Sequence, residues 1–240
     1  KEEFTHYFFV ADDLVLNPTI NQNNYNEHLN LNKSTCFIPH FITLHERTKW
    51  WKRVGEALRW NVNLKGVEAQ NQLPDYDKAI EKFKKNNLSI KSLSFSQIWN
   101  IPEKNKEYLR RLFEDKVFLK NSLKNKFKNI SYDLSYPMIG SYSDIFVVSS
   151  DAIKSFCHYC GVFAATELFV ELALPTSIIL AAEEVVTEED LKLKGRAFWT
   201  EEEYQELDKF DNSLDKLLVE FPKNYLYIHP IKLSKWRTEL

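Results

Sequence analysis

An apolar stretch that ends in two adjacent carboxylates constrains this chain most. Tyr7-Phe8-Phe9-Val10 is aromatic and β-branched, which is typical of a buried β-strand, and Asp12-Asp13 follows after a single alanine. Asn17-Pro18 then ends the regular pattern, because the residue before a proline is disfavoured in helical geometry. Ligands of α/β sheets bind at the carboxyl ends of strands, so we expect both aspartates at a binding edge.

The Asp12-Asp13 pair has two interpretations. Adjacent negative charges repel each other, and a hard divalent cation is a common reason for a protein to keep them together. In the other interpretation one carboxylate caps the next turn and its neighbour is solvated. Both interpretations stay open at this position, directly after a hydrophobic strand.

The composition is that of a soluble globular protein. Of the 240 residues, 44% are hydrophobic and 28% are charged, and this length can build one large domain or two small ones. The formal net charge is −2, which argues against a basic surface of the kind that binds nucleic acid. We therefore expect no nucleic-acid partner.

The cysteines predict a reducing compartment. The chain has three of them, Cys36, Cys157 and Cys160, a number that does not describe a disulfide framework. We therefore expect a cytoplasmic protein. Cys157-x-x-Cys160 could suggest zinc or redox chemistry, but it falls late in an apolar helical stretch, and we predict two buried thiols instead.

The most apolar run of the chain does not predict a membrane span. Residues 162–182 include Glu167, Glu171 and Pro175, so no transmembrane segment is expected. The chain begins with Lys1 rather than Met and reaches its first strand within a few residues, so we expect the natural N-terminus to lie further upstream.

Strand and helix patterns alternate along the chain and predict an α/β fold. Strands are expected over 142–148 and 225–228, and possible short ones over 36–39 and 197–199. Helices are expected from the cap at 74–77 to 85, over 102–128 and over 152–160, and over 163–182 in two pieces divided by Pro175. A last helical pattern starts at the cap at 200–203 and continues through Leu214, Leu217 and Leu218. Ser150-Asp151 is the expected cap of the helix from 152.

The middle of the chain is expected to be largely helical. Residues 68–130 form a predicted helical insertion, and its lysines are most simply a solvated face. An aromatic stripe at positions 50, 51, 57, 58 and 60 precedes the insertion. Such a stripe usually packs into a core, and less often stacks on sugars.

The last predicted strand leads to a second set of polar residues. His229-Pro230-Ile231-Lys232 follows residues 225–228 directly. Carboxylates and an imidazole can hold a divalent ion that bridges two phosphates, while a lysine neutralises the remaining oxygens. Alone, His229 would more often be a packing or capping histidine; with Lys232 and the Asp pair it becomes a candidate ligand.

These elements resemble nucleotide-sugar glycosyltransferases of the GT-A fold. Such enzymes carry a short acidic motif at the end of a strand, which Ala11-Asp12-Asp13 matches, and several close the metal site from near the C-terminus with a histidine followed by a lysine. His229 and Lys232 look like that element. The resemblance spans nearly the whole chain, as the later portion of the fold without its first nucleotide-binding section.

The resemblance implies a role for each matching residue. Asp13 and His229 would bind manganese or magnesium, and Asp12 would contact the ribose or a metal-bound water. Lys232 would hold the diphosphate.

Two further carboxylates are the catalytic candidates that the resemblance implies. Residues 140–144 resemble the acceptor-side strand of these folds and end in Asp144. Glu171, or Glu167 one turn earlier, would deprotonate the acceptor hydroxyl in an inverting enzyme. The plainer interpretation of both glutamates is a polar edge on a buried helix.

The resemblance implies a single GT-A-like catalytic domain over residues 1–240, with a mixed sheet flanked by helices. Its expected activity is transfer of a sugar from a nucleotide diphosphate donor to a glycan, lipid or protein acceptor. Two alternatives remain, a non-catalytic α/β binding module and a metal-dependent phosphoester hydrolase that uses the same acids.

Overall fold

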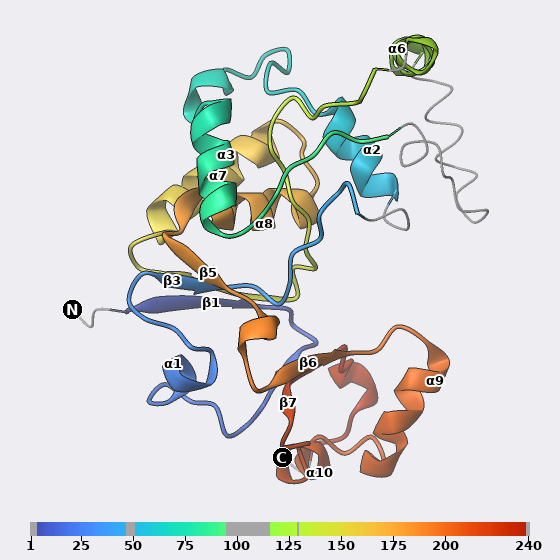
Figure 1. Ribbon diagram of the computed structural model, residues 1–240. Helices are drawn as coiled ribbons and strands as arrows, with labels where there is room; N and C mark the ends of the chain where they lie inside the picture. Colours follow the sequence, from blue (N-terminus) through green and yellow to red (C-terminus); the bar gives the residue numbers. More distant parts are fainter. Residues whose placement is uncertain (1–3, 47–50, 95–115, 129, 239–240) are drawn as a thin grey trace. The chain divides into compact units, whose positions relative to one another are not determined.

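The computed structural model describes residues 4–46, 51–94, 116–128 and 130–238, and these form a mixed α/β fold (Figure 1). The chain divides into two compact units. The first, here called the β unit, comprises residues 1–40, 142–151 and 185–240. The second, the α unit, comprises residues 41–141 and 152–184 and contains the predicted insertion over 68–130.

The β unit carries a four-stranded sheet in the order β1-β4-β3-β5. Its strands are β1 (His6–Val10), β4 (Ile145–Ser149), β3 (Thr35–Phe37) and β5 (Glu184–Val186). Both β1 and β3 run antiparallel to β4. The predicted strand over 142–148 therefore begins only at Ile145, and the residues before it approach the sheet as a loop.

Strand β1 forms as predicted, but the prediction that it is buried is wrong. Tyr7, Phe8, Phe9 and Val10 are each between 37% and 44% exposed. The reason is position, since β1 is the end strand in the sheet order and pairs only with β4. An aromatic and β-branched pattern reports the preference for extended backbone and cannot distinguish a central strand from an edge strand.

A second sheet of three strands has the order β2-β7-β6. Its strands are β2 (Val15–Leu16), β7 (Tyr225–His229) and β6 (Lys194–Ala197), and β7 is antiparallel to β2 and parallel to β6. Gly195 lies directly against β7, where an added Cβ would stand 2.1 Å from the Tyr227 ring. Glycine is therefore required at this position, because the buried ring occupies the space of any side chain.

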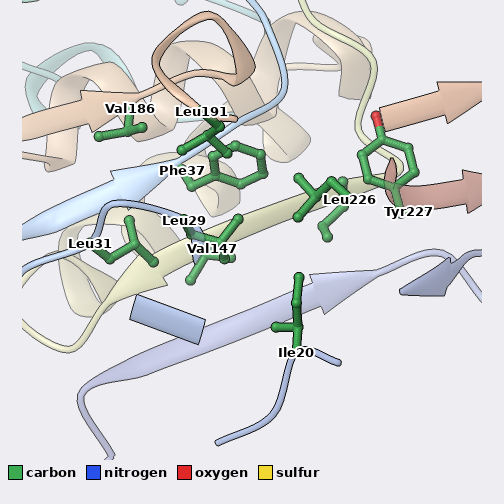
Figure 2. Close-up of a cluster of buried hydrophobic side chains, with 10 residues drawn as sticks. Ile20, Leu29, Leu31, Phe37, Val147, Val186, Leu191, Leu226 and Tyr227 are labelled. Atoms are coloured by element: carbon green, nitrogen blue, oxygen red, sulfur yellow. The ribbon is translucent and has the colours of Figure 1, made fainter. Parts of the chain in front are cut away.

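The core of the β unit lies against both sheets. Phe37, Val147 and Leu226 are fully buried there and face one another from β3, β4 and β7 (Figure 2). Leu29 and Leu31 join them after the short helix α1 (Tyr25–His28). These aliphatic and aromatic side chains hold the two sheets in one core.

The C-terminal part of the β unit adds short helices and a second apolar cluster. The helices are α9 (Glu201–Tyr204) and α10 (Leu214–Val219), with 3₁₀ turns at Glu188–Asp190, Gln205–Phe210 and Leu233–Lys235. The predicted cap at Thr200 is confirmed as a capping box with Glu203. Phe198, Phe210, Leu217 and Ile228 form the centre of the cluster.

The α unit contains α2 (Trp51–Arg59), α3 (Tyr76–Lys85), α6 (Lys116–Phe127), α7 (Ile153–Ala165) and α8 (Val170–Ala181), with a 3₁₀ turn at Gln70–Gln72. The predicted cap of α3 is confirmed, because the Asp75 side chain accepts a hydrogen bond of 2.9 Å from the Lys78 N–H. Of the helix predicted over 102–128, the part in α6 is confirmed and residues 102–115 lie outside the described ranges.

Helices α7 and α8 correct the predicted ends of the apolar helices. Ala152, rather than Ser150 or Asp151, occupies the N-cap of α7, so the predicted Ser150-Asp151 cap is wrong. The predicted break at Pro175 is also wrong, since this proline lies inside α8. The chain instead turns after α7 at Glu167, where φ is 60°.

A hydrogen-bond donor from another segment of the α unit explains why the helix continues through Pro175. A proline has no N–H to donate to the carbonyl four residues before it, which here belongs to Glu171. The Ser141 N–H donates to that carbonyl at 3.0 Å, so the missing helical bond is replaced from outside the helix.

The aromatic stripe before the insertion packs into the α unit where it is described. Trp60 is 7% exposed and its indole N–H donates to the Thr166 hydroxyl at 3.1 Å, while Ala57 is fully buried. Position 50 and the side chain at position 51 lie outside the described part. The core interpretation is confirmed for Ala57 and Trp60.

Within the described ranges, no helix combines the length and the apolar character needed to cross a bilayer.

Candidate active site

Strand pairing brings the two ends of the chain together. Strand β2 pairs with β7 so that Val15 lies opposite Ile228, and the antiparallel register continues to the Ile231 N–H, which donates to the Asp13 carbonyl at 2.6 Å. Asp13 therefore lies beside His229, the last residue of β7. The register is specific, because Leu16 packs against the core that contains Phe37 and Val15 against the cluster that contains Phe198, and a slip of one residue would exchange the faces of these two side chains.

A second pairing brings Asp144 to the same place. Strand β1 pairs with β4, and the pairing extends to Ala11, whose N–H donates to the Asp144 carbonyl at 2.7 Å. The turn that holds Asp12 and Asp13 thus lies between two strand pairs. This arrangement fixes the positions of Asp13, Asp144 and His229 relative to one another.

The His229 imidazole lies between two carboxylates. Its Nε2 is 3.0 Å from Asp13 Oδ1, and its Nδ1 is 3.5 Å from Asp144 Oδ2. The His229 side chain is only 12% exposed, against 29% for Asp13 and 27% for Asp144. At 3.5 Å the Asp144 contact is electrostatic, and the buried Nδ1 has no hydrogen-bond partner among the described residues.

This geometry fits a metal ion held by two protein ligands rather than three. Ligands about 2.1 Å from an octahedral ion lie roughly 3 Å apart when they are neighbours, which is the Asp13–His229 spacing. Asp144 faces the other ring nitrogen and cannot share that ion. Accordingly, the described residues contain no group of three or more His, Cys, Asp or Glu side chains arranged around a metal.

Asp144 is placed as the outer partner of a metal-binding histidine would be. A ligating imidazole usually directs its second nitrogen at a carboxylate, which fixes the tautomer and the ring orientation. With a proton on Nδ1, facing Asp144, the Nε2 lone pair of His229 is directed at the Asp13 side. The sequence placed Asp144 among the catalytic candidates but gave no sign of its contact with His229.

The two remaining residues of the predicted site are solvent-exposed. Asp12 lies in the turn closed by the Leu14 N–H, which donates to the Ala11 carbonyl at 3.1 Å. Lys232 precedes the 3₁₀ turn at Leu233–Lys235, and its ammonium forms no ion pair within the described ranges. Both side chains can reach a ligand without breaking an internal contact.

The predicted acceptor base, Glu171, belongs to the α unit. Its carboxylate accepts a hydrogen bond of 2.6 Å from Arg53 Nε, and the same guanidinium contacts Glu56 at 3.1 Å and lies over the Phe169 ring. Glu171 thus joins α2 to α8. Its role in catalysis stays a prediction, as does that of Glu167, which ends the turn after α7 with φ of 60°.

A further carboxylate of the β unit, Glu188, contacts Tyr227 of β7. The Glu188 carboxylate accepts hydrogen bonds from the Tyr227 hydroxyl and the Gly195 N–H. Its Oε1 is buried and has no hydrogen-bond partner in the described part of the chain. Burial raises the pKa of Glu188 above its ordinary value of 4.5. Burial also raises the pKa of Tyr227, to which the charges of Glu188 and Asp144 contribute.

Replacement of Glu188 by glutamine is expected to stabilise the protein at neutral pH. The pKa of Glu188 is higher in the folded chain than in the unfolded chain, so the folded chain favours the protonated carboxyl. The resulting contribution to stability is fully present at a pH below the pKa of the unfolded chain. It is lost as the pH rises through the pKa of the folded chain. Glu188→Gln should therefore raise Tm by a few degrees at pH 7, and the difference from the wild type should vanish near pH 4. Thermal unfolding from pH 4 to 8 measures this.

The exposed neighbour provides the control for that measurement. Glu189→Gln also removes one negative charge but leaves no buried group changed, so its Tm difference should stay near zero. A Tm difference between Glu188→Gln and the wild type that is constant over the whole pH range would contradict the assignment of a buried charge.

The thiols of the Cys-x-x-Cys pair are not both buried, which corrects that prediction. Cys157 is exposed and Cys160 half-buried on α7, and both are free, as is the buried Cys36. Burial raises the pKa of Cys160 to about 11, so this thiol is protonated at neutral pH. The helical period explains why the two cysteines differ in exposure, because residues three apart lie on only approximately the same face of a helix.

Comparison of the chain with models of protein families, with curated proteins and with solved structures finds no match.

Proposed function

We propose that this chain is a metal-dependent glycosyltransferase, or part of one, that transfers a sugar from a nucleotide diphosphate. One observation carries the proposal: Asp13 Oδ1 and His229 Nε2, from opposite ends of the chain, lie 3.0 Å apart at the ends of adjacent strand pairs. An acidic motif after a strand and a histidine near the C-terminus are the features that the chain shares with GT-A enzymes. We also propose that its fold is of the GT-A type.

Asp13 and His229 would hold manganese or magnesium, and Asp144 would orient the imidazole. Two protein ligands are sufficient for such ions, which commonly keep waters and take further oxygens from substrate phosphates. The carboxylate suits Mn²⁺ and Mg²⁺, whereas the imidazole suits transition metals, so the pair fits Mn²⁺ better than Mg²⁺. When bound, the ion would offset the negative charge that develops on the departing diphosphate.

The exposed residues of the site would hold the donor. Lys232 would pair with diphosphate oxygens, and its lack of an ion pair within the described ranges leaves its ammonium available for that contact. Asp12 would accept a hydrogen bond from a ribose hydroxyl or from a metal-bound water. The acceptor hydroxyl must lose its proton to a base, for which Glu171 and Asp144 are the candidates.

Calorimetry with Mn²⁺, and then with UDP and GDP in the presence and absence of Mn²⁺, tests the proposal. We expect Mn²⁺ to be required for binding of one of the two diphosphates, since the ion bridges protein and phosphate. A protein that binds neither diphosphate with Mn²⁺ and releases no phosphate from p-nitrophenyl phosphate would be a non-catalytic module. Release of phosphate from p-nitrophenyl phosphate, with no binding of a nucleotide diphosphate, would identify a phosphoester hydrolase instead.

A further inference from the structure

We propose that Trp199 and Tyr142 form a platform that binds a pyranose ring of the acceptor, an inference that rests on the function proposed above. The two rings lie 5.1 Å apart between centroids and are tilted by 39°. Trp199 is 60% exposed, although it lies next to the buried Phe198. An exposed indole that packs against a second aromatic ring still presents aromatic surface to a ligand.

Each of the two platform residues is close in the backbone to a residue of the candidate active site. The Phe198 N–H donates to the His229 carbonyl at 2.9 Å, and Trp199 is the next residue. Tyr142 precedes Asp144 by two residues in the loop that enters β4. Trp199 and Tyr142 thus come from two different segments of the β unit, and each is close in the chain to a residue that contacts His229.

Tyr204 marks a third approach to the same region. Burial raises the pKa of Tyr204, and the charge of Asp13 contributes to the rise, so this phenol lies within electrostatic range of the site. Its ring also packs against Phe198, with 5.7 Å between centroids. Trp199 and Tyr204 are therefore two exposed aromatic side chains that follow the buried Phe198 in the chain, and Tyr204 is the one within electrostatic range of Asp13.

The backbone holds Trp199 in place. Its N–H donates to Glu203 Oε2 at 2.8 Å, and the same oxygen accepts from the Thr200 N–H at 3.0 Å in the capping box of α9. The Tyr142 ring in turn packs edge-on against His40, with 5.2 Å between centroids. A surface that is already ordered loses little conformational entropy when a ligand binds.

The surrounding charges favour a neutral, hydroxyl-rich ring. One face of a pyranose carries C–H groups, which suit the negative face of an indole, and its hydroxyls are hydrogen-bond donors. The exposed carboxylates of Glu201 and Glu202 follow Trp199 by two and three residues and can accept from such hydroxyls. They would repel a ring that carries phosphate, which argues against a nucleotide as the occupant.

Fluorine NMR of protein labelled with 5-fluorotryptophan tests the inference. The Trp199 signal is assigned by its absence in Trp199→Phe, and the probes are methyl glycosides of glucose, galactose, mannose and N-acetylglucosamine, with uridine as the competing ligand. We expect at least one glycoside to shift the Trp199 signal, with a Kd of about 10 mM or tighter. Saturation-transfer difference spectra of that glycoside should weaken at least about tenfold in Trp199→Ala and only partly in Trp199→Phe.

Phe4→Ala is the matched control. Phe4 is 64% exposed in the same unit but lies before β1, at the end opposite the Asp pair, so its removal should leave glycoside binding unchanged. The inference is overturned if no glycoside shifts the Trp199 signal, if only uridine does, or if Trp199→Ala binds as the wild type does.

Failure of this inference and failure of the proposed function are distinguishable. Asp13→Ala should lose Mn²⁺-dependent binding of the diphosphate and keep binding of the glycoside, whereas Trp199→Ala should show the reverse. If a glycoside binds at Trp199 but the protein binds no diphosphate with Mn²⁺, the platform is supported and the transferase function is rejected. If the protein binds a diphosphate with Mn²⁺ but no glycoside shifts the Trp199 signal, the transferase function is supported and the platform is rejected.

Discussion

Asp13→Ala is expected to abolish Mn²⁺-dependent binding and turnover of a nucleotide sugar while the protein stays folded. The carboxylate is 3.0 Å from His229 Nε2 and 29% exposed, so its removal takes away one of two proposed ligands without opening the core. Loss of an outer partner of a metal ligand typically costs about 10–100-fold in metal affinity, so loss of a direct ligand should cost at least about 100-fold. Electron paramagnetic resonance of free Mn²⁺ and hydrolysis of UDP-glucose and GDP-mannose measure the two effects.

Graded variants separate the roles within the site. Asp144→Asn keeps the shape of the side chain but removes its charge from the Nδ1 side of His229, so we expect a loss of about 10–100-fold in Mn²⁺ affinity. Asp151→Ala, an exposed aspartate after β4, is the control and should bind Mn²⁺ as the wild type does. Equal Mn²⁺ affinity in Asp13→Ala and the wild type would falsify the metal assignment.

Phe37→Ala is expected to destabilise the β unit by about 3–5 kcal/mol, because it removes a fully buried ring and leaves a cavity. Phe37 lies on β3 opposite Val147 of β4, in the core drawn in Figure 2. The effect should be local to this core. Hydrogen exchange of the β4 amides is the suitable measurement, since it reports the opening free energy of that strand by itself.

Phe127→Ala is the matched control for the core variant. The same side chain is removed, but Phe127 is 86% exposed at the end of α6, so the expected change is within about 0.5 kcal/mol. A small effect of Phe37→Ala on exchange at Val147 would mean that β3 and β4 are not held together by this core.

Local signals in the sequence predicted many of the elements, because their physical causes act over a few residues. The side chains of Asp75 and Thr200 cap α3 and α9 as expected, since a cap depends only on the next turn of the chain. Pro175 misled the prediction, because its effect on α8 depends on a donor from another segment, the Ser141 N–H. The same limit applies to Ala152, which begins α7 without a side-chain cap.

The candidate site was predictable in its residue types but not in its geometry. Asp13 and His229 stood out because each follows a strand pattern, and the structure places them 3.0 Å apart. Their roles as metal ligands stay predictions. The contact of Asp144 with His229 and the exposed Trp199 beside Tyr142 had no local signal, since both depend on which strands pair.

By itself the sequence determined that the chain alternates strands and helices, that several helices begin at particular caps, and that carboxylates and a histidine follow strands. Only the tertiary structure decided that β1 is an exposed edge, that Pro175 lies within a helix, and that Asp13, Asp144 and His229 meet. The physical reason is the distance along the chain over which each interaction acts. Backbone preferences and caps act between neighbours in the chain, whereas burial, strand order and register depend on segments that are distant in sequence.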